Sequence, residues 1–168
     1  MTRIHKTAIT GMLTAVCVAL SPLSVPVGSA RCFPIQHMMN VIAGVLLGPS
    51  YAVMMAFSAS LLRNLLGTGT LLAFPGSMLG ALLAGLGAKY TRGGLLPACA
   101  GELIGTGFLG ALAAYPLAAF VMGREAALFA FVVPFALSSA GGAAIAFTLL
   151  LIITKRIPHK EGTQRLLP

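Results

Sequence analysis

The sequence predicts an all-α membrane protein with about six transmembrane helices in a compact bundle and with both termini inside the cell. Composition carries the first part of this prediction. Of the 168 residues, 58% are hydrophobic and only 8% are charged, and the mean hydropathy is +0.96. A soluble domain carries about 25% charged residues. This chain therefore lacks the polar side chains that would cover a globule in water.

Six apolar segments, each close to the roughly 20 residues that cross a bilayer, form a single transmembrane domain over residues 1–168. We expect helices at about 8–23, 34–48, 50–66, 71–89, 95–116 and 125–154. A short cytoplasmic tail is expected at 158–168.

Turn-forming residues set the limits of these segments. The first segment follows a basic start that is similar to a secretion signal, but we expect it to be retained as a helix, and it ends at a Pro/Ser/Gly-rich loop. Pro34 suits the first turn of the second helix. Gly48 and Pro49 separate this helix tightly from the third. The later segments end at Lys89, Pro116 and Thr154.

Basic residues predict the orientation, because Lys and Arg concentrate in cytoplasmic loops. With the N-terminus inside, eight basic residues are cytoplasmic and three lie towards the outside. The cytoplasmic ones are Arg3, Lys6, Lys89, Arg92, Lys155, Arg156, Lys160 and Arg165, and the outer ones are Arg31, Arg63 and Arg124.

The chain lacks the motifs of enzymes and of metal or nucleotide sites. It has no Asp, no paired carboxylates, no HExxH sequence and no Walker A loop. Its three cysteines, Cys17, Cys32 and Cys99, are far apart and show no ligand spacing. We therefore expect no catalytic residues, no metal, no cofactor and no nucleic-acid partner.

Two polar segments interrupt the apolar sequence and converge in the predicted topology. The second helix runs inward and begins near the outer surface, whereas the third runs outward and the fourth begins outside. Polar groups at membrane depth are costly and usually functional. We therefore expect an outward-facing small-molecule pocket, covered by the 24–33 loop and the Gly-Thr-Gly-Thr turn. The candidate binding residues are Gln36, His37, Asn40, Arg63, Asn64, Thr70, Phe74 and Ser77.

The side chains of this pocket suit a neutral heteroaromatic ligand with a ring nitrogen and a hydroxyl. Gln36 and Asn40 share a helix face and offer amide donors and acceptors beside the imidazole of His37. The alternatives stay open at this point. Gln36 and His37 could cap an interfacial helix start, and Arg63 could extend to the outer headgroups.

Glu102 is a tempting partner for Arg63, but the topology argues against it. The fifth helix starts inside, so Glu102 lies about 10 Å above its inner end at 1.5 Å per residue. Arg63 lies near the opposite face. Glu102 is expected to bond the first or the sixth helix, to be protonated, or to reach water.

The first helix carries small residues at four-residue spacing, namely Gly11, Ala15 and Ala19. Such a stripe lets another helix backbone approach closely. It could serve packing within the chain or the docking of a partner subunit.

The Phe33–Asn40 segment, the Val45–Pro49 turn and the Arg63–Ser77 block resemble the ThiW family, whose members are substrate-binding S components of energy-coupling factor (ECF) transporters. The resemblance covers about residues 8–155. It implies a six-helix S-component bundle in the cell membrane, which captures hydroxyethylthiazole, a thiamine precursor, from outside. It also implies a transmembrane coupling protein and two cytosolic ATPases as partners, with Ala15 and Ala19 matching the AxxxA docking pattern.

Three other functions remain as alternatives. Within transport, the chain could be an S component for the pyrimidine moiety or for another vitamin. From a different class, it could be a membrane-embedded enzyme or a scaffold without a ligand. Saturable binding in the absence of any ATPase distinguishes a capture subunit from a scaffold.

Overall fold

The computed structural model describes residues 1–27, 30–123 and 127–156, and within these ranges the chain is mainly helical. The fifth helical segment is continuous and joins two α-helices and two π-helices. The elements are α1 (Arg3–Ala19), β1 (Val25–Val27), β2 (Ala30–Cys32), α2 (Pro34–Leu47), α3 (Pro49–Leu65), α4 (Ala73–Tyr90), α5 (Leu95–Glu102), η1 (Leu103–Gly110), α6 (Ala111–Pro116), η2 (Leu117–Val121) and α7 (Val132–Arg156).

The predicted helical fold is confirmed, with differences at particular boundaries. α1 spans Arg3–Ala19 and not the predicted 8–23. It begins earlier because the side chain of Thr2 accepts a hydrogen bond from His5 N and caps the helix. α7 begins at Val132 instead of residue 125. The predicted start of this helix at residue 125 and the predicted tail at 158–168 lie outside the described residues.

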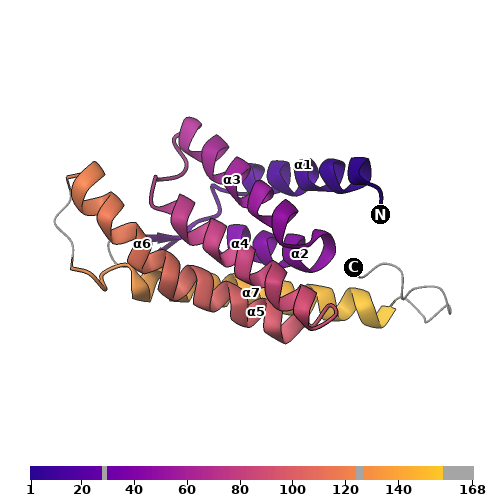
Figure 1. The fold of residues 1–168 in the computed structure, drawn as a ribbon. Coiled ribbons are helices and arrows are strands. Elements are labelled where there is room, and N and C mark those ends of the chain that lie inside the picture. Colours follow the sequence, from indigo (N-terminus) through magenta and orange to yellow (C-terminus); the bar gives the residue numbers. More distant parts are fainter. Residues whose placement is uncertain (28–29, 124–126, 157–168) are drawn as a thin grey trace.

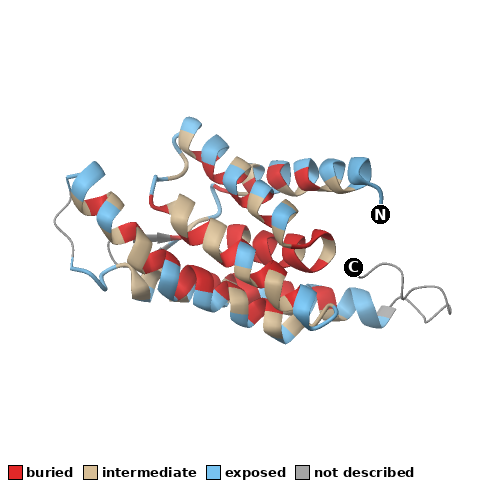
Figure 2. Cartoon of the chain, viewed as in Figure 1, coloured by how far each residue is buried: buried red, intermediate tan, exposed pale blue. Residues whose placement is uncertain are grey.

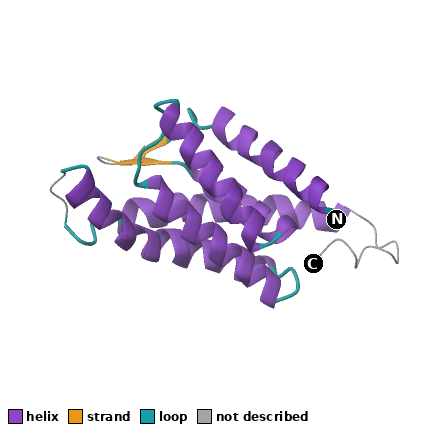
Figure 3. Ribbon diagram, turned by 45° about the horizontal axis from the view of Figure 1, so that its top comes forward, coloured by secondary structure: helices purple, strands orange, loops and turns teal. Residues whose placement is uncertain are grey.

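A short antiparallel hairpin replaces part of the predicted 24–33 loop. β1 pairs with β2, with Val25 opposite Cys32. Figure 3 shows the two strands at the end of the bundle opposite the N-terminus. The pairing matters for the site, because β2 leads directly into Phe33 and the first turn of α2.

Two helical segments of the described chain are long and apolar enough to cross a membrane. They are Leu95–Val121, with 27 residues, and Val132–Lys155, with 24. α2 is apolar but shorter, and its 14 residues span about 21 Å at 1.5 Å per residue. The polar residues of its first two turns, Gln36, His37 and Asn40, are buried in the bundle.

The basic ends of several helices gather at one end of the bundle (Figure 1). The N-terminal part of α1, the α2–α3 connection and the C-terminal end of α4 meet there, since Lys6, Gly48 and Lys89 line one cavity. The hairpin, the N-terminus of α2 and the C-terminus of α3 lie at the other end. Lys6 and Lys89, two of the eight basic residues predicted on the cytoplasmic side, therefore lie at the same end of the bundle.

Small residues allow the central helices to approach closely. α4 packs against α3, α2, α5 and η1. At Gly105 of η1, an added Cβ would lie only 2.5 Å from Leu79 O, so a side chain there would force the two helices apart. Close contact between helix backbones is typical of membrane bundles, where small residues line the interfaces.

Large apolar side chains cover much of the outer surface. Figure 2 shows buried residues in the middle of the bundle and exposed ones along its outer helices. Phe120, Tyr90 and Leu65 are 84%, 81% and 75% exposed. A soluble monomer rarely exposes apolar surface on this scale. The surface therefore fits a lipid environment.

Candidate functional site

A buried glutamate forms the centre of a polar network in the middle of the bundle. Glu102, the last residue of α5, is 0% exposed. Its Oε1 lies 2.8 Å from His37 Nδ1 and accepts hydrogen bonds from Asn40 Nδ2 at 3.2 Å and from Thr106 Oγ1 at 2.7 Å. Three partners on one oxygen offset part of the cost of burying this carboxyl group.

A second group of polar side chains continues the network towards the hairpin end. Arg63 Nη1 donates to Gln36 Oε1, and Gln36 Nε2 donates to Ser60 Oγ at 2.9 Å. The hydroxyls of Ser60 and Ser77 are 2.9 Å apart. Asn40 Nδ2 also donates to the backbone oxygen of Ser77 at 3.1 Å. The two groups thus form one network across α2, α3, α4 and the α5–η1 junction.

Local backbone features make room for this network. η1 begins directly after Glu102, and π-helical turns occur frequently at functional sites. At Gly80 of α4, an added Cβ would lie 2.6 Å from Glu102 Oε2 and would also collide with Thr106 Oγ1. The missing side chain at this position therefore leaves the space that the carboxylate occupies. Gly76 contributes its backbone oxygen, which accepts from Thr106 Oγ1 at 2.9 Å.

Three buried polar atoms of the network have no hydrogen-bond partner among the described residues. They are Asn40 Oδ1, Glu102 Oε2 and Arg63 Nε. Buried polar groups are hydrogen-bonded in the great majority of cases. Each of these three atoms could therefore form a hydrogen bond with a bound molecule. Two are acceptors, if Glu102 is ionised, and one is a donor.

The hairpin end closes over the network. The ring of Phe33 lies 3.9 Å from the Arg63 guanidinium carbon, in cation–π geometry. Phe33 N donates to Ser138 Oγ at 2.7 Å, which ties the start of α2 to α7. The Ser21 hydroxyl donates to Thr68 Oγ1 at 3.1 Å, which ties the end of α1 to the turn after α3. Arg63 is consequently only 1% exposed.

Cys32 adds a further tie between the hairpin and α7. Its thiol donates to Pro134 O at 3.4 Å. Burial raises the pKa of the Cys32 thiol, while the hydrogen bond with Ser138 acts in the opposite direction. The thiol is therefore protonated at neutral pH and can serve as the donor in this contact.

The structure brings five of the eight predicted binding residues into the network and leaves three outside it. The five are Gln36, His37, Asn40, Arg63 and Ser77.

The other three residues lie around the network. Asn64 Nδ2 donates to Ser60 O and to Thr70 O, so it links the end of α3 to the following turn. Thr70 itself is exposed. Phe74 packs edge-on against Phe57, with ring centroids 5.8 Å apart, on the outer face of α3 and α4.

Three polar residues of the network do not appear among the predicted binding residues, namely Ser60, Glu102 and Thr106. Of the alternatives for Glu102, bonding to the first or the sixth helix is not what the structure shows, because its partners His37 and Asn40 belong to α2. Its separation from Arg63 does agree with the sequence argument, since no direct hydrogen bond joins them within the described chain. One signal could have found Glu102. An ionisable residue within an apolar span is a functional candidate by default.

The described residues show no group of three or more His, Cys, Asp or Glu side chains that could hold a metal ion. The network has one carboxylate and one imidazole, which is fewer ligands than metal sites normally use.

The small-residue stripe of α1 faces away from the bundle. Gly11, Ala15 and Ala19 are all exposed, and an added Cβ at Gly11 would meet nothing within 4 Å. Packing of this stripe within the described part of the chain is therefore not its role. The face remains open to lipid or to another protein.

A helical bundle with an apolar outer surface and a buried polar network defines the class of integral membrane proteins. The chain matches the family model described as thiamine-precursor transporter protein (ThiW) over residues 7–156. It therefore belongs to the ThiW family of thiamine-precursor transporters. Membership in this family implies a transport role and not catalysis. No curated protein and no solved structure matches the chain.

Proposed function

We propose that this chain is the substrate-capture subunit of an ECF-type importer and that it binds hydroxyethylthiazole from the outer side of the cell membrane. The observation that carries the proposal is the buried network around Glu102 with its three unpaired polar atoms. Family membership supplies the transport context. The site supplies the chemistry of recognition.

The unpaired atoms complement the groups of this ligand. A ligand hydroxyl donates to Asn40 Oδ1 or to Glu102 Oε2, and a ring nitrogen accepts from Arg63 Nε. Each buried pair formed in this way removes the penalty of an unsatisfied polar group. Phe33 and His37 provide flat faces on which an aromatic ring can stack.

The polar network is sealed, so binding requires the hairpin end to open. The Phe33 ring packs over the Arg63 guanidinium at the hairpin end of the network. The ties that must loosen are few, namely the contacts of Phe33 and Cys32 with α7 and the contact of Ser21 with Thr68. Closure around the ligand would then exclude water.

Orientation and partners complete the proposal. The end of the bundle that holds Lys6 and Lys89 faces the cytoplasm, in agreement with the positive-inside rule. The site then opens outward. The exposed stripe of Gly11, Ala15 and Ala19 docks a transmembrane coupling protein, which works with two cytosolic ATPases.

Calorimetry on the purified chain in detergent, without any ATPase, tests the proposal. Hydroxyethylthiazole is expected to bind with nanomolar to micromolar affinity, and the thiamine pyrimidine and whole thiamine much more weakly. Binding of the pyrimidine or of thiamine alone would replace the substrate but keep the capture role. A complete lack of saturable binding would favour a scaffold, and turnover of the ligand would reveal an enzyme.

A further inference from the structure

A cavity at the Lys6 end of the bundle is separate from the polar network. Its volume is about 270 Å³, well above the about 10–15 Å³ that admits one water. It lies where the α2–α3 connection meets α1 and the end of α4. Its lining residues are Lys6, Gly44, Val45, Leu47, Gly48, Pro49, Ser50, Tyr51, Ala88, Lys89 and Gly93.

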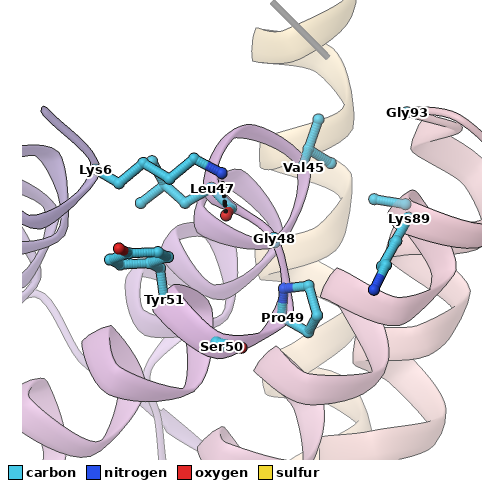
Figure 4. Close-up of a pocket in the computed structure, with 11 residues that line it drawn as sticks. Lys6, Val45, Leu47, Gly48, Pro49, Ser50, Tyr51, Lys89 and Gly93 are labelled. Carbon is cyan, nitrogen blue, oxygen red and sulfur yellow. Dashed lines mark hydrogen bonds between the residues drawn. The ribbon is translucent and has the colours of Figure 1, made fainter. Parts of the chain in front are cut away.

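Two lysines on different helices face this cavity (Figure 4). Lys6 Nζ donates to Leu47 O at 3.2 Å and lies 5.7 Å from the centre of the Tyr51 ring, so its position is fixed from two sides. An ammonium has three donors, and the contact with Leu47 uses one of them. Lys89 comes from the last turn of α4 on the opposite wall.

The positive charge of this cavity has no counter-ion within the described residues. Glu102 is the one carboxylate that they contain, and it is bonded to His37, Asn40 and Thr106 in the polar network. An anion is thus the complement of this site.

We propose that this cavity binds a phosphate group, supplied either by the headgroup of an anionic phospholipid or by free phosphate. Lysine ammonium groups bind phosphate as point charges, and basic residues at membrane ends attract anionic lipids. The apolar walls formed by Val45, Leu47 and Pro49 accommodate the part of a lipid next to its headgroup. The site is separate from the proposed thiazole site, because its residues do not belong to the network around Glu102.

Native mass spectrometry of the delipidated full chain tests the proposal with two probes. Phosphatidylglycerol is compared with phosphatidylcholine of the same acyl chains, and inorganic phosphate is titrated separately. We expect phosphatidylglycerol or phosphate to bind in preference to phosphatidylcholine. Lys6→Gln and Lys89→Gln are each expected to weaken that binding about fivefold. If the lysine variants lose binding of phosphatidylglycerol, the phosphate group comes from a lipid headgroup. If they lose binding of inorganic phosphate, it comes from the free ion.

Lys155→Gln is the matched control, because Lys155 is exposed and does not line the cavity. It removes the same charge and should leave binding unchanged. Ser50→Trp adds bulk at the cavity lining without changing charge and should weaken binding. If Lys155→Gln weakens binding as much as the cavity variants, or if neither probe binds with preference, the proposal is overturned. Thermal melting of each variant shows that the fold is retained.

Discussion

His37 Nδ1 and Glu102 Oε1 lie 2.8 Å apart inside the bundle, although 65 residues separate them in the sequence. The pair joins the first turn of α2 to the end of α5, at the point where the π-helix η1 begins. Glu102 is completely buried, and its carboxylate has one oxygen with three partners and one oxygen with none. The bonded oxygen ties α5 to α2, and the unpaired oxygen is the atom that the proposed ligand would contact.

Glu102→Gln is expected to weaken hydroxyethylthiazole binding by about 10- to 100-fold. The amide keeps the size of the side chain but replaces one carboxyl oxygen with an NH2 group that cannot accept a hydrogen bond, and a buried partner left unsatisfied costs about 1–3 kcal/mol. Calorimetry on the purified chain measures the change. Thr106→Val removes one neutral partner of Glu102 and should weaken binding less, by about 5-fold.

Thr148→Val is the control for the threonine change, since Thr148 is exposed and bonds only to Ala144 O in its own helix. The affinity of the Thr148→Val variant for hydroxyethylthiazole should equal that of the unmodified chain. Unchanged affinity in Glu102→Gln would remove Glu102 from the binding site and leave it a purely structural role.

Gly80→Ala is expected to disturb the network by a purely steric route. The new methyl group would lie 2.6 and 2.7 Å from the two carboxylate oxygens of Glu102 and would overlap Thr106 Oγ1. Overpacking of this kind costs about 1–3 kcal/mol, so the melting temperature should fall and binding should weaken. Thermal unfolding monitored by circular dichroism measures the melting temperature.

Gly11→Ala is the matched control, because its added Cβ meets nothing within 4 Å. In a helix, Gly to Ala stabilises by up to about 1 kcal/mol, so the melting temperature should stay the same or rise. Equal destabilisation by both substitutions would show that loss of glycine as such, and not contact with Glu102, is responsible.

The convergence of Gln36, His37, Asn40 and Arg63 could be predicted from the sequence, because helix direction and charge bias set the depth of each residue. The neighbours of Glu102 could not be predicted in this way. The depth of a residue in the membrane does not determine which other helix lies beside that residue. That depends on the glycine-mediated approach of α4 to α5 and η1, and on the short length of α2. The hairpin at 25–32 was missed for a similar reason, since its strands of three residues carry little pattern of their own.

Arg63→Lys is expected to weaken ligand binding about tenfold while keeping the positive charge. The guanidinium contacts Gln36 Oε1, Thr68 O and the face of Phe33 at once, and its Nε is available to a ligand. An ammonium cannot reproduce this planar arrangement. Arg3→Lys, at an exposed position on α1, should have no effect on calorimetric affinity. Full affinity in Arg63→Lys would mean that only the charge matters.

Ala15→Trp is expected to separate capture from transport. Ala15 is exposed in the middle of the small-residue stripe of α1, so an indole there projects outward and leaves the bundle intact. Binding of hydroxyethylthiazole by the isolated chain should be unchanged. Co-purification with the coupling protein and the two ATPases should be lost, because the large side chain prevents close approach of a partner helix.

Leu149→Trp introduces the same indole at an exposed position of α7, with 41% of the leucine accessible. Assembly should survive this change if the docking face is specific to α1. Assembly that survives Ala15→Trp as well would contradict docking through the stripe, because contact between helix backbones cannot tolerate a side chain of that size between them. The role of Gly11, Ala15 and Ala19 would then be contact with lipid, and the capture proposal would stand on the Glu102 network alone.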